Sequence, residues 1–156
     1  MSGEYCDQFR HHETAADRER QRVQFEHAAA FFGMTYEIFQ YAYSRQDAAF
    51  FLNDKYVARV EAKYRFHYKG FHPTYTIDVD KLEALVTRAR RDGVHELLLV
   101  SWNGDEYYLS RFAGEYKDWP ITIQKHSTRK EYPDPVRNVP LHRFFPVRWQ
   151  EALPAD

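Results

Sequence analysis

The 156-residue chain is predicted to form one α/β domain of the α+β kind, in which helices flank a mixed central sheet. Three observations predict this class. Apolar and polar residues alternate strictly from Val57 to Phe66, the pattern of a half-buried strand. Two segments, 17–32 and 81–92, carry apolar residues at helical spacing between start and stop signals. The run 95–102, HELLLVSW, is largely apolar, which is typical of a central buried strand.

The first elements follow in chain order. A helix is expected from Asp17, a suitable N-cap, to Phe32, because Gly33 supplies a stop. The segment 34–43, MTYEIFQYAY, predicts a strand. Residues 46–66 then predict two strands joined by a tight polar turn.

The second half of the core begins after a loop expected over 67–75, where glycine and proline act as breakers. Asp80 and Glu83 fit a capping box at the start of the second helix, and Gly93 ends it. The buried strand and an Asn-Gly turn follow, and 106–111 is the returning strand. The predicted order is therefore helix, three strands, helix, two strands.

The two ends of the chain are expected to differ from this core, which spans 17–112. Residues 1–16 are polar and predicted to be loosely ordered. Residues 113–156 predict an irregular, basic, proline-rich extension packed on the same domain. Between positions 121 and 150 six cations outnumber two acids, so this segment carries +4 while the whole chain carries −1. Such a segment suits a polyanion, and an ordinary solvated tail is the alternative.

Composition excludes several protein classes. A hydrophobic content of 44% argues against disorder in the body of the chain. No apolar run approaches the ~20 residues of a membrane helix, and the first residues do not form a signal peptide. The single cysteine, Cys6, excludes an internal disulfide. Together these features predict a cytoplasmic protein.

Charged side chains gather on one face of the 46–66 hairpin. The alternation puts these residues on its polar face: Val57, Arg59, Glu61, Lys63 and Arg65. Asp47 opens the other strand. Two such acids with a neighbouring lysine can form a divalent-metal site beside a cation, the minimal equipment for metal-assisted phosphodiester cleavage. The alternative is a solvent-facing Glu61/Lys63 pair on an ordinary hairpin.

The turn decides whether Asp47 and Glu61 meet, because residues directly opposite in an antiparallel pair share a face. A three-residue loop, 53–55, puts Leu52 opposite Tyr56 and Asp47 opposite Glu61. A two-residue loop, 53–54, slips the register by one and turns Asp47 to the other face. A bulge would change the count again. The loop contains no glycine, so its composition leaves these registers open.

The order of elements around Asp47 and Glu61-Ala62-Lys63 resembles the PD-(D/E)XK nuclease superfamily. Over about 18–112, with HELLLVSWNGDEYYLS near its end, the chain is similar to small Holliday-junction resolvases and small phage-encoded nucleases. The resemblance implies a restriction-endonuclease-like αβββαβ core. Gln46 stands where the superfamily has a proline, which is a departure from the pattern.

The resemblance also implies roles. Asp47, Glu61 and the Ala62 carbonyl would bind Mg²⁺ or Mn²⁺, and Lys63 would orient the attacking water. Glu26, on the first helix, would supply an additional acid. The expected nucleic-acid contacts are Arg59, Arg65, Lys69, Lys125, Arg129 and Lys130.

The first hypothesis is a Mg²⁺-dependent DNA endonuclease acting on branched or structured DNA, possible as a homodimer because symmetric cleavage of two strands calls for two sites. The alternative is a catalytically inactive nucleic-acid-binding or regulatory protein of phage type on the same fold, favoured by the basic, aromatic last third. A third hypothesis, a protein-interaction module, depends on the exposed aromatic residues and the unexplained last third.

Overall fold

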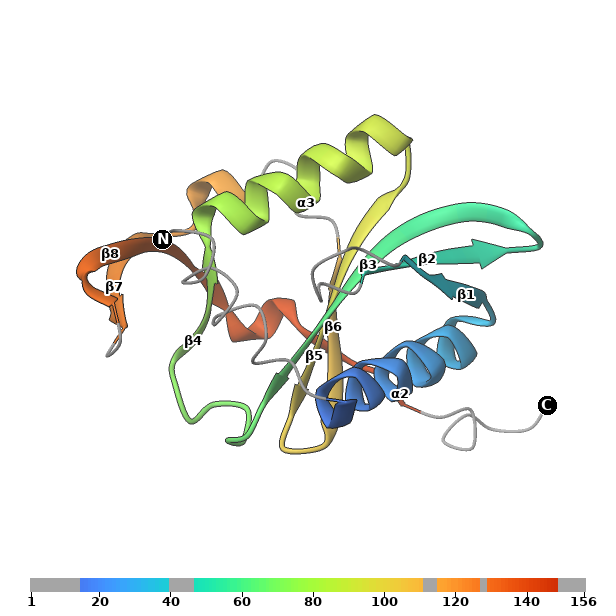
Figure 1. Cartoon of the computed structure of the whole chain (residues 1–156), viewed down its shortest axis with the longest axis horizontal. Helices are drawn as coiled ribbons and strands as arrows, with labels where there is room; N and C mark the ends of the chain where they lie inside the picture. Colours follow the sequence, from blue (N-terminus) through green and yellow to red (C-terminus); the bar gives the residue numbers. More distant parts are fainter. Residues whose placement is uncertain (1–14, 40–46, 111–114, 127–128, 149–156) are drawn as a thin grey trace.

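The computed structural model describes residues 15–39, 47–110, 115–126 and 129–148 (Figure 1). The first elements are α2 (Ala15–Phe32), β1 (Thr35–Ile38), β2 (Asp47–Leu52), β3 (Lys55–Arg65) and β4 (Thr74–Asp78). Helix α3 (Val79–Asp92), β5 (His95–Trp102) and β6 (Asp105–Ser110) follow. The last elements are the short helix η1 (Glu115–Asp118), β7 (Ile121–His126), β8 (Arg129–Pro140), the short helix η2 (Leu141–Arg143) and β9 (Phe145–Pro146).

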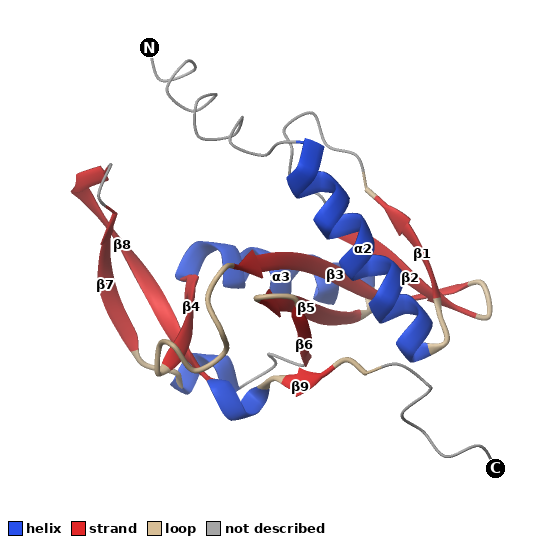
Figure 2. Ribbon diagram, turned by 90° about the horizontal axis from the view of Figure 1, so that it is seen from below, coloured by secondary structure: helices blue, strands red, loops and turns tan. Residues whose placement is uncertain are grey.

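The main sheet is mixed, and a helix lies on each of its faces. Its strand order is β1-β2-β3-β5-β6-β9, with β3 and β5 parallel and the other pairs antiparallel. Figure 2 shows α2 on the near side of β3 and β5, and α3 behind them. This arrangement confirms the predicted fold class, including the restriction-endonuclease-like order of elements.

Each helix packs on its own hydrophobic cluster. Phe25 and Ala28 of α2 lie in a buried cluster with Val60 and Ala62 of β3. Leu85 of α3 packs in the other cluster, which includes Leu98 and Val100 of β5. Because side chains alternate along a strand, the odd-numbered residues of β3 from 59 to 63 point away from α2 and toward α3. This orientation sets the position of the candidate site.

A second, three-stranded sheet has the order β4-β8-β7. The sequence predicts a loop over 67–75 and irregular structure with at most a short strand from 113 onward. Instead β4 begins at Thr74, inside the predicted loop, and the last third forms the two strands β7 and β8. The prolines in the last third argued against a strand at β8, because proline has no N–H to donate to a neighbouring strand. Pro135 pairs with β7 but lies outside the segment of β8 that pairs with β4, Val136–Pro140. Among the described strands, one side of β8 is therefore unpaired at Pro135, and the missing N–H can lie on that side.

The helix ends confirm one predicted signal and correct another. Gly93 has φ 70° and donates its N–H to the carbonyls of Ala89 and Arg90, which ends α3 as expected. The capping box at Asp80 is wrong, because α3 begins at Val79 and is preceded by Asp78, whose side chain makes no capping hydrogen bond. None of the helices in the described ranges is long and apolar enough to cross a membrane.

Candidate active site

The β2–β3 hairpin brings Asp47 and Glu61 together through a turn and a bulge. The loop is the two-residue one: Leu52 pairs with Lys55, and Asn53 and Asp54 take left-handed φ values of 51° and 66°. Asparagine and aspartate tolerate this conformation better than most residues, so no glycine is needed. On this turn alone, Asp47 would lie opposite Val60, whose side chain faces α2.

One extra residue in β3 shifts the pairing by one, to the register in which Asp47 lies opposite Glu61. Phe51 pairs with Tyr56 and Phe50 pairs with Ala58, so the pairing skips Val57. Beyond this β-bulge, Asp47 lies directly opposite Glu61. The two acids therefore share a face of the sheet, the one that α3 covers. We call them the acid pair.

The Ala62 carbonyl points from β3 toward the neighbouring strand β2. The backbone N–H of Phe39 donates to the Asp47 carbonyl at 2.8 Å, so the peptide groups of Asp47 point toward β1. Asp47 and Glu61 consequently form a non-hydrogen-bonded pair, and the Glu61 carbonyl points toward β5. The next carbonyl, that of Ala62, points the opposite way, to the side on which Asp47 lies.

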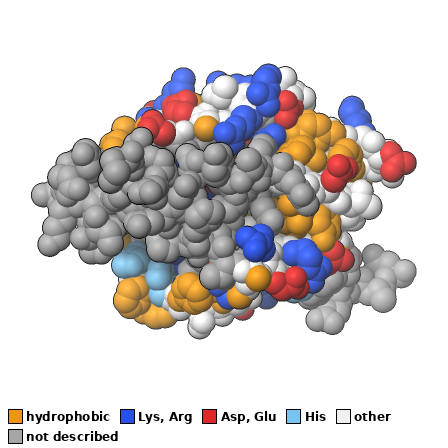
Figure 3. Space-filling model, viewed as in Figure 1, with side chains coloured by type: hydrophobic (Ala, Val, Ile, Leu, Met, Phe, Trp, Pro, Cys, Tyr) orange, Lys and Arg blue, Asp and Glu red, His pale blue; other side chains and the backbone are white. Residues whose placement is uncertain are grey.

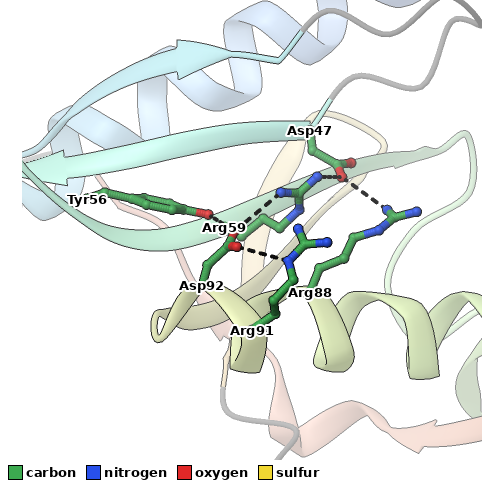
Figure 4. Close-up of polar contacts among 6 residues, drawn as sticks. All are labelled: Asp47, Tyr56, Arg59, Arg88, Arg91 and Asp92. Carbon is green, nitrogen blue, oxygen red and sulfur yellow. Dashed lines mark hydrogen bonds and ion pairs between the residues drawn. The ribbon is translucent and has the colours of Figure 1, made fainter.

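Arginines from the sheet and from α3 hold the Asp47 carboxylate (Figure 4). Arg59 donates from Nη2 to Asp47 Oδ2 at 3.2 Å, and Arg88 Nη1 lies 3.7 Å from the same oxygen. Arg59 also pairs through Nη1 with Asp92 Oδ2 at 3.6 Å, and the Tyr56 hydroxyl donates to Asp92 at 2.8 Å. Both contacts to Asp47 use Oδ2, so this network neutralises the acid through one of its two oxygens.

The acid pair is buried, and burial raises the pKa of one of its members, Asp47. Asp47 is 2% exposed and Glu61 is 8% exposed. Loss of solvent raises the pKa of Asp47 above its ordinary 3.8, and the negative charge of Glu61 raises it further. Arg59 and Arg88 oppose this shift but do not cancel it. A cation bound between the two carboxylates would relieve the same repulsion.

Lys63 follows the acid pair on the same face of β3. Neither Glu61 nor Lys63 takes part in an ion pair within the described part of the chain. The backbone of Lys63 is anchored from α2, where the buried Gln24 donates from Nε2 to the Lys63 carbonyl at 2.8 Å. The strand is thus fixed at this point while the ammonium group remains available to a substrate.

The donor set fits a hard divalent cation. Two carboxylates on adjacent strands and a carbonyl pointing to the same side of β3 supply the oxygen ligands that Mg²⁺ prefers. Among the described residues no group of three or more His, Cys, Asp or Glu side chains could hold a metal ion. Asp47, Glu61 and the Ala62 carbonyl would therefore hold the metal together with water, as Mg²⁺ sites in proteins commonly do.

The structure does not bring two of the predicted residues to this site in their expected roles. Glu26 is exposed on α2, at the opposite face of the sheet, where it accepts a hydrogen bond from the Tyr36 hydroxyl at 2.7 Å. Arg59, expected to contact DNA phosphates, is instead 4% exposed and paired with Asp47. Alternation placed Arg59 on the polar face correctly, but it could not show that α3 covers that face.

The remaining predicted cations lie farther along the chain. Arg65 donates to the Tyr75 hydroxyl at 3.1 Å and stacks on that ring, and the Lys69 ammonium lies 4.9 Å from the centre of the Tyr107 ring. The other three predicted contacts belong to β7 and β8, but their side chains are outside the described part of the structure: Lys125, Arg129 and Lys130.

Sequence reasoning missed Arg88 and Asp92. Cations in the last turns of a helix suit its dipole, which explains their number in α3 without assigning any of them a partner. The position of Arg88 in the sequence, one helical turn before Asp92, could have identified these two residues. An arginine that faces the sheet one turn before the end of the helix can reach a strand that carries acids.

Comparison with protein-family models matches residues 8–147 to the family described as "Phage putative PDDEXK endonuclease". The chain belongs to this family. Comparison with curated proteins and with solved structures finds no match. The predicted resemblance to the PD-(D/E)XK nuclease superfamily is confirmed, and the match extends beyond residue 112 into the C-terminal third.

Membership of the phage PDDEXK endonuclease family identifies the general class of the protein. Nucleases of the PD-(D/E)XK superfamily generally use divalent metals, and an endonuclease family implies DNA as the substrate. The resemblance seen in the sequence would assign the superfamily's two acids and lysine to Asp47 and Glu61-Ala62-Lys63. Gln46, at the position of the superfamily's proline, lies outside the described residues.

Proposed function

We propose that the protein is a Mg²⁺-dependent endonuclease that hydrolyses phosphodiester bonds of DNA. The observation that supports it best is the register of the β2–β3 hairpin, in which Asp47 lies directly opposite Glu61. Lys63 lies two residues farther on the same face. These three positions would carry the superfamily's acids and lysine.

The side chains would divide the chemistry among them. Asp47, Glu61 and the Ala62 carbonyl would bind Mg²⁺ or Mn²⁺, which when bound activates water and offsets charge on the scissile phosphate. Lys63 would orient the attacking water and hold it near the phosphorus. The Arg88 side chain is 39% exposed and approaches the acid pair from α3, so it would contact the scissile phosphate.

Partner and location follow from this substrate. Each chain carries one acid pair among its described residues, so cleavage of both strands of a duplex at one place would use a homodimer. A DNA substrate would also place the protein in the cytoplasm. Sedimentation analysis with and without DNA tests the dimer, and a monomer that still makes double-strand cuts would contradict it.

Cleavage of linear, nicked and four-way-junction DNA in Mg²⁺ or Mn²⁺ tests the activity. We expect Glu61→Gln and Asp47→Asn to reduce cleavage to background, and Lys63→Met to do so without loss of metal affinity. Glu19→Gln, an exposed glutamate on α2, is the matched control and should cut as the wild type does. Isothermal titration with Mn²⁺ provides a second measurement, in which the two acid variants should lose binding.

Two outcomes would contradict this function. Cleavage that survives in both acid variants would assign the activity to another site or to a contaminant. A wild-type protein that binds DNA in a salt-sensitive manner but never cuts it would instead favour the inactive, regulatory alternative.

A further inference from the structure

The loop between β3 and β4 exposes three aromatic side chains. This segment, residues 66–72, is FHYKGFH, and we call it the aromatic loop. Phe66 is 75% exposed, Tyr68 is 62% exposed and Phe71 is 56% exposed. In Figure 3 the pale blue histidines and orange hydrophobic side chains of this region gather at the lower left. A contiguous group of large apolar side chains on an exposed loop is typical of a binding site.

The rings of the aromatic loop hold one another in place. Tyr68 and Phe71 pack edge to face with ring centres 5.6 Å apart, and the Phe71 N–H donates to the Tyr68 carbonyl at 3.1 Å. Gly70 allows this turn with φ 97°. His67 and His72 pack against Phe71 at 5.3 Å and 4.9 Å. The loop therefore presents ordered ring faces and edges to the solvent.

Two histidines of the aromatic loop, His67 and His72, line a groove that begins at Lys63, two residues beyond Glu61. This hollow, of about 730 Å³, lies between the end of β3 and the second sheet. Its lining includes Lys63, Arg65 and Lys81 with His67 and His72, and also the acids Asp78 and Asp134. Lys81 lies 4.0 Å from Asp78, so these two charges offset each other. The cations at the β3 end lie between the acid pair and the aromatic loop.

We infer that the aromatic loop stacks on unpaired bases of a DNA strand whose phosphates contact Lys63 and Arg65. The inference rests on the proposed function and narrows its substrate to DNA with a single-stranded segment, such as a flap, a fork or an open junction. Bases inside a duplex are already stacked, so exposed rings gain little from them. A strand with unpaired bases offers both a phosphate backbone for the cations and a flat face for each ring.

A paired binding measurement tests the inference. The Tyr68→Ala/Phe71→Ala variant should bind a fluorescent single-stranded oligonucleotide at least about tenfold more weakly than wild type does. Its affinity for a duplex of the same length should be unchanged. Binding is measured by anisotropy in EDTA, so that no strand is cut. Leu52→Ala, an exposed residue at the far end of the hairpin, is the control and should bind both DNAs as wild type does.

A second pair of variants separates stacking from simple apolar contact. Phe71→Trp keeps an aromatic face and should retain single-strand affinity, whereas Phe71→Leu should lose it. An unchanged affinity in the double variant, an equal loss for both DNAs, or a Leu variant as tight as wild type would overturn the inference. These results leave the proposed nuclease intact if wild type still cuts duplex DNA. A wild-type protein that binds no DNA at low salt would contradict both.

Discussion

Two parts of strand β3 and its continuation differ sharply in how they relate to solvent. The acid pair and its arginines are enclosed between the sheet and α3, with Glu61 8% exposed and Arg59 4% exposed. Five residues beyond Glu61, Phe66 is 75% exposed. In the first region Asp47 and Arg59 are held by ion pairs, whereas Glu61 faces Asp47 without an ion-pair partner among the described residues. In the second, Tyr68 and Phe71 pack on each other, and Phe66 packs on Tyr64 and Arg20. Substitutions in the first region should therefore disturb folding and chemistry together, whereas those in the second should report on binding alone.

The largest effect on stability is expected from Arg59→Met. The change removes a buried guanidinium that pairs with both Asp47 and Asp92, and leaves the Asp47 carboxylate facing Glu61. Removing one partner of a buried ion pair costs about 3–5 kcal/mol, so urea should unfold this variant at a clearly lower concentration. Arg91→Met is the matched control. Its side chain is 69% exposed beside Asp92, and its loss should cost less than about 1 kcal/mol.

An intermediate effect of opposite sign is expected from Glu61→Gln. Two carboxylates directly opposite on neighbouring strands repel each other, and the variant keeps the shape while removing one charge. Without divalent metal at pH 7, the variant should be more stable than wild type by up to about 1 kcal/mol. A variant less stable than wild type would show that Glu61 is held by favourable contacts.

The pH dependence gives the same prediction a sharper form. Folding raises the pKa of Asp47 above 3.8, so the folded protein binds a proton that the unfolded chain has already released. This contribution lowers stability as the pH rises from 3.8 through the raised pKa, and it is absent below that window. Glu61→Gln removes one cause of the shift. Its advantage should therefore vanish in acid, and NMR titration should find a lower Asp47 pKa.

A smaller effect on stability is expected from Arg88→Met. The Arg88 side chain is 39% exposed, so solvent screens its pairing with Asp47 and its loss should cost less than about 1 kcal/mol. The pKa of Asp47 should nevertheless rise, because Arg88 is one of the groups that lower it. An unchanged Asp47 titration would show that the two side chains do not interact in solution.

The smallest effect on stability is expected in the aromatic loop. Tyr68→Ala/Phe71→Ala removes side chains that are more than half exposed, so the free energy of unfolding should change by less than about 0.5 kcal/mol per residue. Thermal unfolding checks this directly. A large loss would mean that the rings support the fold, and the distinction drawn between the two regions would fail.

Local patterns were enough to predict most of the core. Alternation in β3 identified the polar face, and Gly33 and Gly93 marked the ends of both helices. The pairing of Asp47 with Glu61 was one of two registers that turn composition left open. Sequence could not choose between them, because the choice depends on a left-handed Asn-Asp turn and a bulge acting together.

Sequence reasoning failed where distant segments decide local structure. Residues 74–78 form a strand because β8, some sixty residues later, pairs with them. The prolines of β8 argue against a strand when each is considered alone. The burial of Arg59 likewise depends on α3, which begins twenty residues after it. Non-local contacts of this kind leave no periodic signal in the chain.

The bulge at Val57 shifts the pairing by one residue, and this shift decides whether the two acids lie on the same face of the sheet. If the bulge were lost without loss of a residue, Asp47 would move to the α2 face, although the sequence would still show an acid, a second acid and a lysine in order. Among nucleases with this hairpin, a motif whose spacing differs by one residue should therefore be accompanied by a change in the turn or the loss of the bulge. Insertions of two residues would need no such adjustment. The hairpin can thus lengthen freely only in steps of two.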